Sequence, residues 1–268
     1  MLIPKVVYYT WKNNNFTQEI EDNINHNKKL CPNYKFVFYN YLKCNKFIKE
    51  NFSKQVYNAY MNINPLYGAM KADFWRYCII YKYGGIYLDI EIKLTTNLDN
   101  IIQPHHECIL DKPNYLELYR IFYNQPAYEQ WLLIYKPKHP YLKKLIKYIT
   151  MKINNNYLPT LSKVKFNLTN CKQAILKITG PDIYTKIINS YIKKNKTIHH
   201  IIPFNSFANY NYLGLGLYKK NNMIHYSMLK EPIYLNIDKK EFNKYIPQLN
   251  LLNSIKLLVV KIDFELEV

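Results

Sequence analysis

Two adjacent glycines, Gly84 and Gly85, separate segments with different hydrophobic patterns. Before them, apolar residues between positions 67 and 83 recur three and four residues apart, which predicts a helix. After them, residues 86–92 are largely apolar, which predicts a short buried strand. Glycine commonly ends a helix because it adopts the left-handed backbone conformation without steric cost. A helix that leads directly into a buried strand favours an α/β fold.

The rest of the chain also alternates strands and helices. We predict strands at residues 5–10, 34–39, 86–92, 198–204 and 223–226, and helices at residues 17–30, 41–60, 67–83, 126–152 and 175–190. No internal repeat and no clear linker divides the 268 residues. The sequence therefore predicts a single α/β domain with a helical insertion.

The predicted strand at residues 86–92 contains two acidic residues, Asp89 and Glu91. Side chains two positions apart point to the same face of a strand, so both carboxylates could bind one divalent cation. Burying two like charges without a cation or a base would be unfavourable. The alternative is that the strand emerges into solvent at this point. We favour the metal site.

Asp73 and Arg76 lie three residues apart on the predicted helix, and therefore on one face of it. Alone, they could form an ordinary helical ion pair. However, the short helix–Gly–Gly–strand unit could bring both side chains to the carboxyl end of the strand, close to Asp89 and Glu91. Open α/β sheets build their ligand sites at this end.

The formal net charge of +18 would suit a nucleic-acid ligand. However, only Arg76 and Arg120 are arginines, so 35 of the 37 basic residues are lysines. Proteins that recognise nucleic acids favour the planar guanidinium of arginine. Lys, Asn, Ile and Tyr, which are all abundant here, share A/T-rich codons. We therefore favour an A/T-rich source genome, such as that of a large DNA virus, over a surface selected for polyanions.

Targeting signals and disulfides are also not indicated. No run of 18 apolar residues predicts a spanning helix, and the N-terminus lacks the apolar segment of a signal peptide. The five cysteines are odd in number, far apart and without a C-x-x-C pair, which argues against a disulfide framework or a zinc site. We expect a cytoplasmic protein.

The central segment resembles a known family. Residues 69–91, AMKADFWRYCIIYKYGGIYLDIE, are similar to the A-x-x-S-D-x-x-R-Y…Y-G-G-x-Y-x-D-x-D pattern of DXD-containing glycosyltransferases of the family 32 type. That family includes initiating mannosyltransferases, α1,4-galactosyltransferases and capsular sugar transferases, with clostridial glucosylating toxins as remote relatives. Weaker similarities are IPKVVYYTW at residues 3–11, QW at 130–131, KPKHP at 136–140, TGP at 179–181 and a late histidine, His225.

The resemblance implies a GT-A fold, which is a Rossmann-like mixed sheet with helical insertions. It also implies a retaining transfer, dependent on Mn²⁺ or Mg²⁺, of a hexose or N-acetylhexosamine from a UDP- or GDP-sugar to a glycan or protein acceptor. Residues 1–100 would form the nucleotide-sugar and metal-binding half, and residues 101–268 the acceptor-side half.

Carried over by position, the resemblance also implies residue roles. The catalytic residues would be Asp73, Arg76 and Asp89. The metal ligands would be Asp89, Glu91 and His225. The nucleotide would contact Tyr8, Thr10 and Trp11, and the donor sugar would contact Asp73, Arg76 and Gln130.

Two other interpretations stay open, because the chain departs from the family pattern. Glu91 replaces the usual second Asp, and Tyr8 stands where His is common. A catalytically degenerate GT-A domain could serve as a binding or scaffold protein. Residues 89–93 also match D-x-E-x-K, the pattern of a metal-dependent nuclease of the PD-(D/E)xK type.

Overall fold

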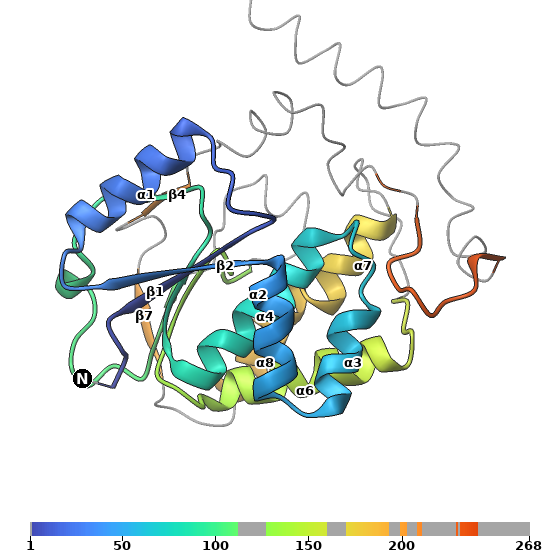
Figure 1. The fold of residues 1–268 in the computed structure, drawn as a ribbon. Helices are drawn as coiled ribbons and strands as arrows, with labels where there is room; N and C mark the ends of the chain where they lie inside the picture. The colour runs from blue at the N-terminus through green and yellow to red at the C-terminus, as the bar shows by residue number, and fades with distance from the viewer. Residues whose placement is uncertain are drawn as a thin grey trace, which may run out of the picture.

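The computed structural model describes residues 2–111, 127–159, 170–192, 199–202, 208–210, 229 and 231–240. A six-stranded mixed sheet forms its centre (Figure 1), in the order β2 (Lys35–Asn40), β1 (Val6–Trp11), β3 (Gly85–Leu88), β6 (Leu132–Tyr135), β5 (Cys108–Asp111) and β7 (His200–Ile202). The pairs β1–β2, β1–β3 and β5–β7 are parallel, whereas β6 is antiparallel to β3 and β5. A second sheet pairs β4 (Ile92–Leu94) with β8 (Ala208–Tyr210). The predicted α/β class is confirmed.

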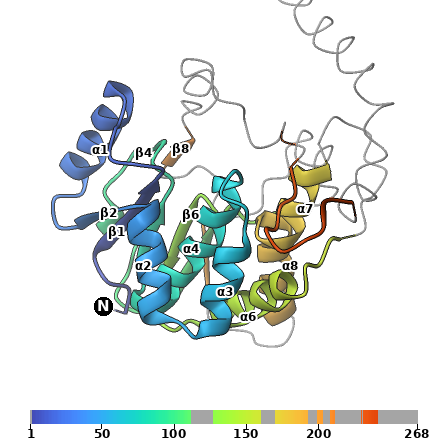
Figure 2. The ribbon, with the colours of Figure 1, turned by 45° about the vertical axis from the view of Figure 1, so that its right-hand side comes forward.

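Helices cover both faces of the large sheet (Figures 1 and 2). On one face lies α1 (Gln18–Leu30), and η1 (Leu98–Asn100) is a short 3-10 turn. The other face carries α2 (Tyr41–Asn51), α3 (Lys54–Asn62), α4 (Gly68–Tyr83), α6 (Pro140–Asn154), α7 (Asn170–Ile178) and α8 (Pro181–Ile192). Alternate residues of each strand enter two hydrophobic cores, one on each face. Within the described residues, no helix combines the length and hydropathy needed to cross a membrane.

Helix α4 is the innermost helix. The predicted apolar stripe, which includes Met70 and Phe74, is buried, but Trp75, Ile79 and Ile80 are buried as well. An amphipathic helix has one apolar face, whereas α4 is enclosed because it packs between the sheet and the other helices. Polar side chains on α4 are therefore held away from bulk water.

The turn between α4 and β3 requires both of its glycines. Gly84 has φ +67° and donates its N–H to the Ile80 carbonyl (2.8 Å), which ends the helix, and Gly85 has φ +93°. A β-carbon on Gly84 would lie 2.6 Å from the Pro137 nitrogen, and one on Gly85 would lie 2.7 Å from the Val6 carbonyl oxygen. Only glycine satisfies both the backbone conformation and the close approach.

Two sequence predictions are wrong in detail. Strand β3 ends at Leu88, so Asp89 and Glu91 lie in a turn closed by the Ile92 N–H and the Asp89 carbonyl (2.9 Å) and do not share one face of a strand. The helix predicted at 126–152 is only partly present. Residues 132–135 form strand β6, and α6 begins at Pro140, a residue that suits the first turn of a helix. The helix predicted within residues 175–190, with its start at residues 179–182, is confirmed as α8, and α7 precedes it. The strand predicted at 223–226 lies outside the described residues.

A lysine on α4 gives a test of this core. Lys71 is 5% exposed, and its Nζ donates to the Tyr60 carbonyl (3.0 Å) and lies 4.2 Å from the Tyr60 ring centroid. No carboxylate of the described residues forms an ion pair with it. Burial lowers the pKa of Lys71 to about 8.

We expect Lys71→Met to stabilise the protein at pH 7 by about 1–2 kcal/mol, because it removes a desolvated charge that has no acidic partner. Between pH 8 and 10, the unfolded wild type binds more protons than the folded protein, so wild-type stability should rise with pH. Urea unfolding of both proteins at pH 7, 8 and 9.5 tests this. If the stability of Lys71→Met rose with pH as steeply as that of the wild type, the lowered pKa would not belong to Lys71.

Candidate active site

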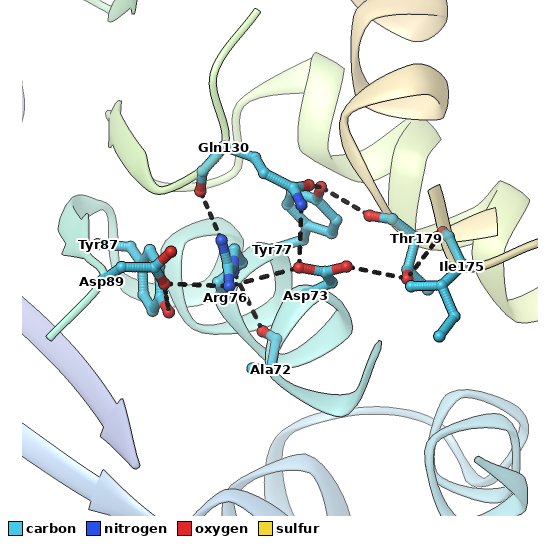
Figure 3. Close-up of polar contacts among 9 residues, drawn as sticks. All are labelled: Ala72, Asp73, Arg76, Tyr77, Tyr87, Asp89, Gln130, Ile175 and Thr179. Atoms are coloured by element: carbon cyan, nitrogen blue, oxygen red, sulfur yellow. Dashed lines mark hydrogen bonds and ion pairs between the residues drawn. The ribbon is translucent and has the colours of Figure 1, made fainter. Parts of the chain in front are cut away.

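Polar side chains from distant segments converge beside the end of β3 (Figure 3). Asp73 and Arg76 come from α4, Asp89 follows β3, Gln130 precedes β6, and Thr179 lies between α7 and α8. The Arg76 Nη2 lies 3.1 Å from the Asp89 Oδ1 and 3.4 Å from the Asp73 Oδ1. One guanidinium therefore bridges two carboxylates.

Arg76 is fixed on several sides. The residue is 5% exposed, its Nη1 donates to the Gln130 carbonyl (2.8 Å), and its guanidinium carbon lies 4.5 Å from the Tyr87 ring centroid. A buried guanidinium needs such partners because desolvation of an unpaired charge is unfavourable. The Arg76 charge is thus held in one place and shared between Asp73 and Asp89.

Asp73 is saturated with contacts. Its Oδ1 accepts a hydrogen bond from the Gln130 Nε2 (3.1 Å), its Oδ2 accepts one from the Thr179 Oγ1 (3.1 Å), and the residue is 4% exposed. The Tyr77 hydroxyl joins the same network through the Gln130 Oε1 and the Thr179 carbonyl. Burial raises the pKa of Asp73 to about 7, although Arg76 and both hydrogen bonds oppose the rise. In this structure, the buried Asp73 carboxylate holds the side chains of Arg76, Gln130 and Thr179 in place.

Asp89 and Glu91 are only partly buried. The Asp89 Oδ1 accepts a hydrogen bond from the Tyr87 hydroxyl (2.5 Å), and the Asp89 backbone N–H donates to the Trp131 carbonyl (2.8 Å). Burial and then the charge of Asp89 raise the pKa of Glu91 to about 7. Two carboxylates thus lie in a position where each disfavours the ionisation of the other.

These two carboxylates fit a divalent cation. Positive charge would relieve their repulsion, and Mg²⁺ is commonly held by one or two carboxylates together with water and substrate phosphates. In the described part of the chain, no three His, Cys, Asp or Glu side chains are grouped to hold a metal ion. His225 lies outside the described residues.

The residues expected at the nucleotide are on β1. Tyr8 and Thr10 are buried, and the Thr10 Oγ1 donates to the Tyr39 carbonyl (2.9 Å). Trp11 points to the other side, against the core beneath α1. Strands β1 and β3 are parallel, with Tyr8 opposite Tyr87, so Trp11 and Asp89 both lie at the carboxyl ends of their strands, on the same side of the sheet's mid-line. Nucleotide contact by these residues stays a prediction.

Three members of the network, Tyr77, Tyr87 and Thr179, stand in the quoted motifs but were given no role by the sequence analysis. For Tyr87 a signal existed, because strand alternation places a residue two positions before Asp89 on the same side. Tyr77 and Thr179 belong to the R-Y and TGP similarities, but no sequence pattern predicts the hydrogen bond that joins them across 102 residues.

Comparison with known proteins agrees with the geometry. Residues 17–108 match the family model described as a glycosyltransferase sugar-binding region containing a DXD motif. The expected resemblance to DXD-containing glycosyltransferases is confirmed over this region. The matched region includes α4, the glycine turn, Asp89 and Glu91, but it ends before Gln130 and Thr179.

The glycosyltransferase relatives include two curated proteins. The chain is 27% identical over 161 residues to inositol phosphoceramide mannosyltransferase 1 of Schizosaccharomyces pombe, covering 58% of this chain and 45% of that protein. It is 25% identical over 198 residues to an uncharacterized glycosyltransferase of Acanthamoeba polyphaga mimivirus, covering 73% and 68%. The chain thus spans less than half the length of the fission-yeast relative.

Among solved structures, the chain is similar to the UDP-bound glycosyltransferase domain from the YGT toxin, with a TM-score of 0.51 and 8% identity. The similarity covers 78% of this chain and 80% of that domain. At this identity it concerns the fold alone. The expected GT-A type of mixed sheet is confirmed.

Proposed function

We propose that this protein is a metal-dependent, retaining glycosyltransferase that uses a UDP- or GDP-sugar and a glycan or protein acceptor. The observation that carries the proposal is the Arg76 bridge between Asp73 and Asp89, beside Glu91, within the region matched by the family. The relatives' names favour a mannosyl group as the sugar transferred.

We assign Asp89 and Glu91 as the protein ligands of Mn²⁺ or Mg²⁺. When bound, the cation would neutralise the charge that develops on the leaving diphosphate. Arg76 and Tyr87 both contact the Oδ1 of Asp89, so we assign its Oδ2 to the ribose and the cation. The role of His225 as a third ligand remains part of this proposal.

The buried network fixes the geometry of these ligands. Asp73 holds Arg76, and Arg76 holds Asp89, so the carboxylate needs no reorganisation when the donor binds. Asp73, Arg76 and Gln130 are also proposed to bind the donor sugar. For the two buried charged residues, this contact requires the sugar to reach below the present surface.

The proposed division of labour places nucleotide and metal in residues 1–100 and the acceptor side in residues 101–268. Both halves belong to one structural unit, because β3 and β6 pair within one sheet. The network also draws Gln130 and Thr179 from the second half to Asp73. In this proposal, the donor site therefore takes residues from both halves.

The nuclease interpretation is not supported by the geometry. Its lysine, Lys93, is exposed on β4, and no ion pair joins it to a carboxylate of the described residues. Asp73 already accepts from Gln130 and Thr179 through both oxygens. A catalytically degenerate GT-A scaffold protein, by contrast, would differ from the proposed enzyme only in lacking turnover.

A thermal-shift measurement tests the proposed function. With Mn²⁺ present, a nucleotide sugar at about 100 times its Kd should add ~2.7 kcal/mol of stability, or about 5–10 °C in Tm. The panel contains UDP, GDP, GDP-mannose, UDP-glucose and UDP-N-acetylglucosamine. EDTA and Glu91→Gln should each abolish the shift. A full shift in EDTA would contradict the metal assignment, and no shift with any nucleotide would contradict the function.

Asp73→Asn separates sugar recognition from nucleotide recognition. The substitution keeps the shape of the side chain but removes the charge that holds Arg76. We expect the Kd of the sugar nucleotide to rise about tenfold or more, while the Kd of the bare nucleotide changes less than about threefold. Isothermal titration with both ligands measures this. Equal losses would assign Asp73 to the nucleotide or to folding.

A further inference from the structure

The helices on one face of the sheet form a surface with one sign of charge. Helices α2, α3, α4, α6 and α8 carry exposed lysines at positions 43, 46, 49, 54, 82, 143, 144, 147 and 186. Among the described residues of these helices, Glu50 is the one exposed acidic side chain, and it pairs with Lys46 (3.8 Å). We call this the outer-helix surface.

These helices form one continuous layer (Figures 1 and 2). Helix α3 packs between α2 and α6. The Phe47 and Tyr83 rings, 5.7 Å apart, join α2 to the end of α4, and the Asn154 Nδ2 donates to the Gln55 carbonyl (3.2 Å), which joins α6 to α3. The Lys144 Nζ donates to a hydroxyl on α8. The lysines therefore share one broad side of the molecule.

Helix α1, which lies on the opposite face, has no such excess of positive charge. Helix α1 carries Lys28 and Lys29 but also Glu19, Glu21 and Asp22. Codon bias would increase the number of lysines on both faces alike. The difference between the outer helices and α1 is therefore not explained by composition alone.

Apolar side chains lie among the lysines. Eight large apolar side chains are exposed in the described residues, and six of them belong to this side: Leu42, Met61, Leu66, Tyr83, Met151 and Leu235. Leu42 is 78% exposed beside Lys43 on α2, and Leu235 is tied to the end of α3 by a hydrogen bond to the Asn62 carbonyl (2.8 Å). A surface that is both basic and apolar matches the boundary between lipid headgroups and acyl chains.

We propose that the outer-helix surface binds the anionic surface of a lipid membrane. Lysines near such a surface gain attraction from its negative potential, and Leu42 and Tyr83 would insert between headgroups. Nucleic acid fits less well, because no described arginine is exposed there; Arg76 is buried.

Vesicle co-sedimentation of the full chain tests this surface. We expect binding to phosphatidylcholine vesicles containing about 30% phosphatidylserine, little binding to pure phosphatidylcholine, and release at about 0.5 M salt. Lys143→Gln/Lys147→Gln on α6 should weaken binding by about tenfold or more. The matched control, Lys28→Gln/Lys29→Gln on α1, removes the same charge and should change binding less than about twofold.

A second variant tests the apolar component. Leu42→Gln should weaken vesicle binding by about threefold or more, and should not change binding of a single-stranded RNA probe. Circular dichroism checks that each variant is folded. Equal losses in the α6 and α1 variants would overturn the proposal, as would absent vesicle binding. Tighter binding to RNA than to vesicles, with Leu42→Gln without effect on either, would assign the surface to nucleic acid instead.

Discussion

Glu91→Ala should lower sugar transfer by about 1000-fold or more and should not lower the stability of the metal-free protein. The loss follows if Glu91 is a cation ligand, because a bound cation supplies several kcal/mol of stabilisation to the leaving diphosphate. The gain in stability follows because Glu91 is partly desolvated and lies beside Asp89, which together raise its pKa to about 7. Relief of about 1 kcal/mol corresponds to ~2–4 °C in Tm.

The sign of the pH dependence gives an independent measurement. Because the pKa of Glu91 rises from 4.5 to about 7 on folding, the folded protein binds more protons than the unfolded chain between these values. Without metal, the stability of the wild type should therefore fall as the pH rises through this range, and the stability of Glu91→Gln should fall less. The control is Lys93→Ala, an exposed position two residues after Glu91, which should leave the rate of sugar transfer unchanged. Wild-type turnover in Glu91→Ala would remove the metal assignment.

Arg76→Met should be the most destabilising single substitution in the site. It leaves Asp73 buried without its cation and takes one contact from Asp89. Removing one partner of a buried ion pair commonly costs about 3–5 kcal/mol, so we expect a fall of about 10 °C in Tm. Chemical unfolding and scanning calorimetry measure the loss.

Two further variants show whether the loss comes from unpaired charge. Asp73→Asn in the Arg76→Met background should recover part of the stability, because the buried carboxylate is then neutral. Lys71→Met, on the same helix, should change stability in the opposite direction, because Lys71 has no acidic partner in the described residues. A loss below about 1 kcal/mol in Arg76→Met would mean that the carboxylates are protonated or hydrated.

Local patterns predicted the parts of the site that are local in sequence. The three-residue spacing of Asp73 and Arg76, and the helix that ends at Gly84, follow from helical periodicity and glycine chemistry. Strand alternation failed at Asp89 and Glu91, because the chain leaves the sheet after Leu88 and turns there. Periodicity describes an element but does not locate its last residue.

The contacts that complete the site are of another kind. Gln130 reaches Asp73 across 57 residues and Thr179 across 106 residues. No spacing rule encodes these pairs, which depend on how β6 and α8 pack against α4. The strand β6 was predicted as helix because its apolar run is short, and periodicity alone does not separate a buried strand from a buried helix.

The backbone carbonyls of two consecutive residues, Gln130 and Trp131, connect the site to the rest of the sheet. The Gln130 carbonyl accepts from the Arg76 side chain, and the Trp131 carbonyl accepts from the Asp89 backbone N–H. Because the acceptors are backbone atoms, any side chain at position 131 that packs equally well preserves them. An inserted or deleted residue, by contrast, would displace both contacts at once. This short segment must therefore keep its length as well as the Gln130 side chain.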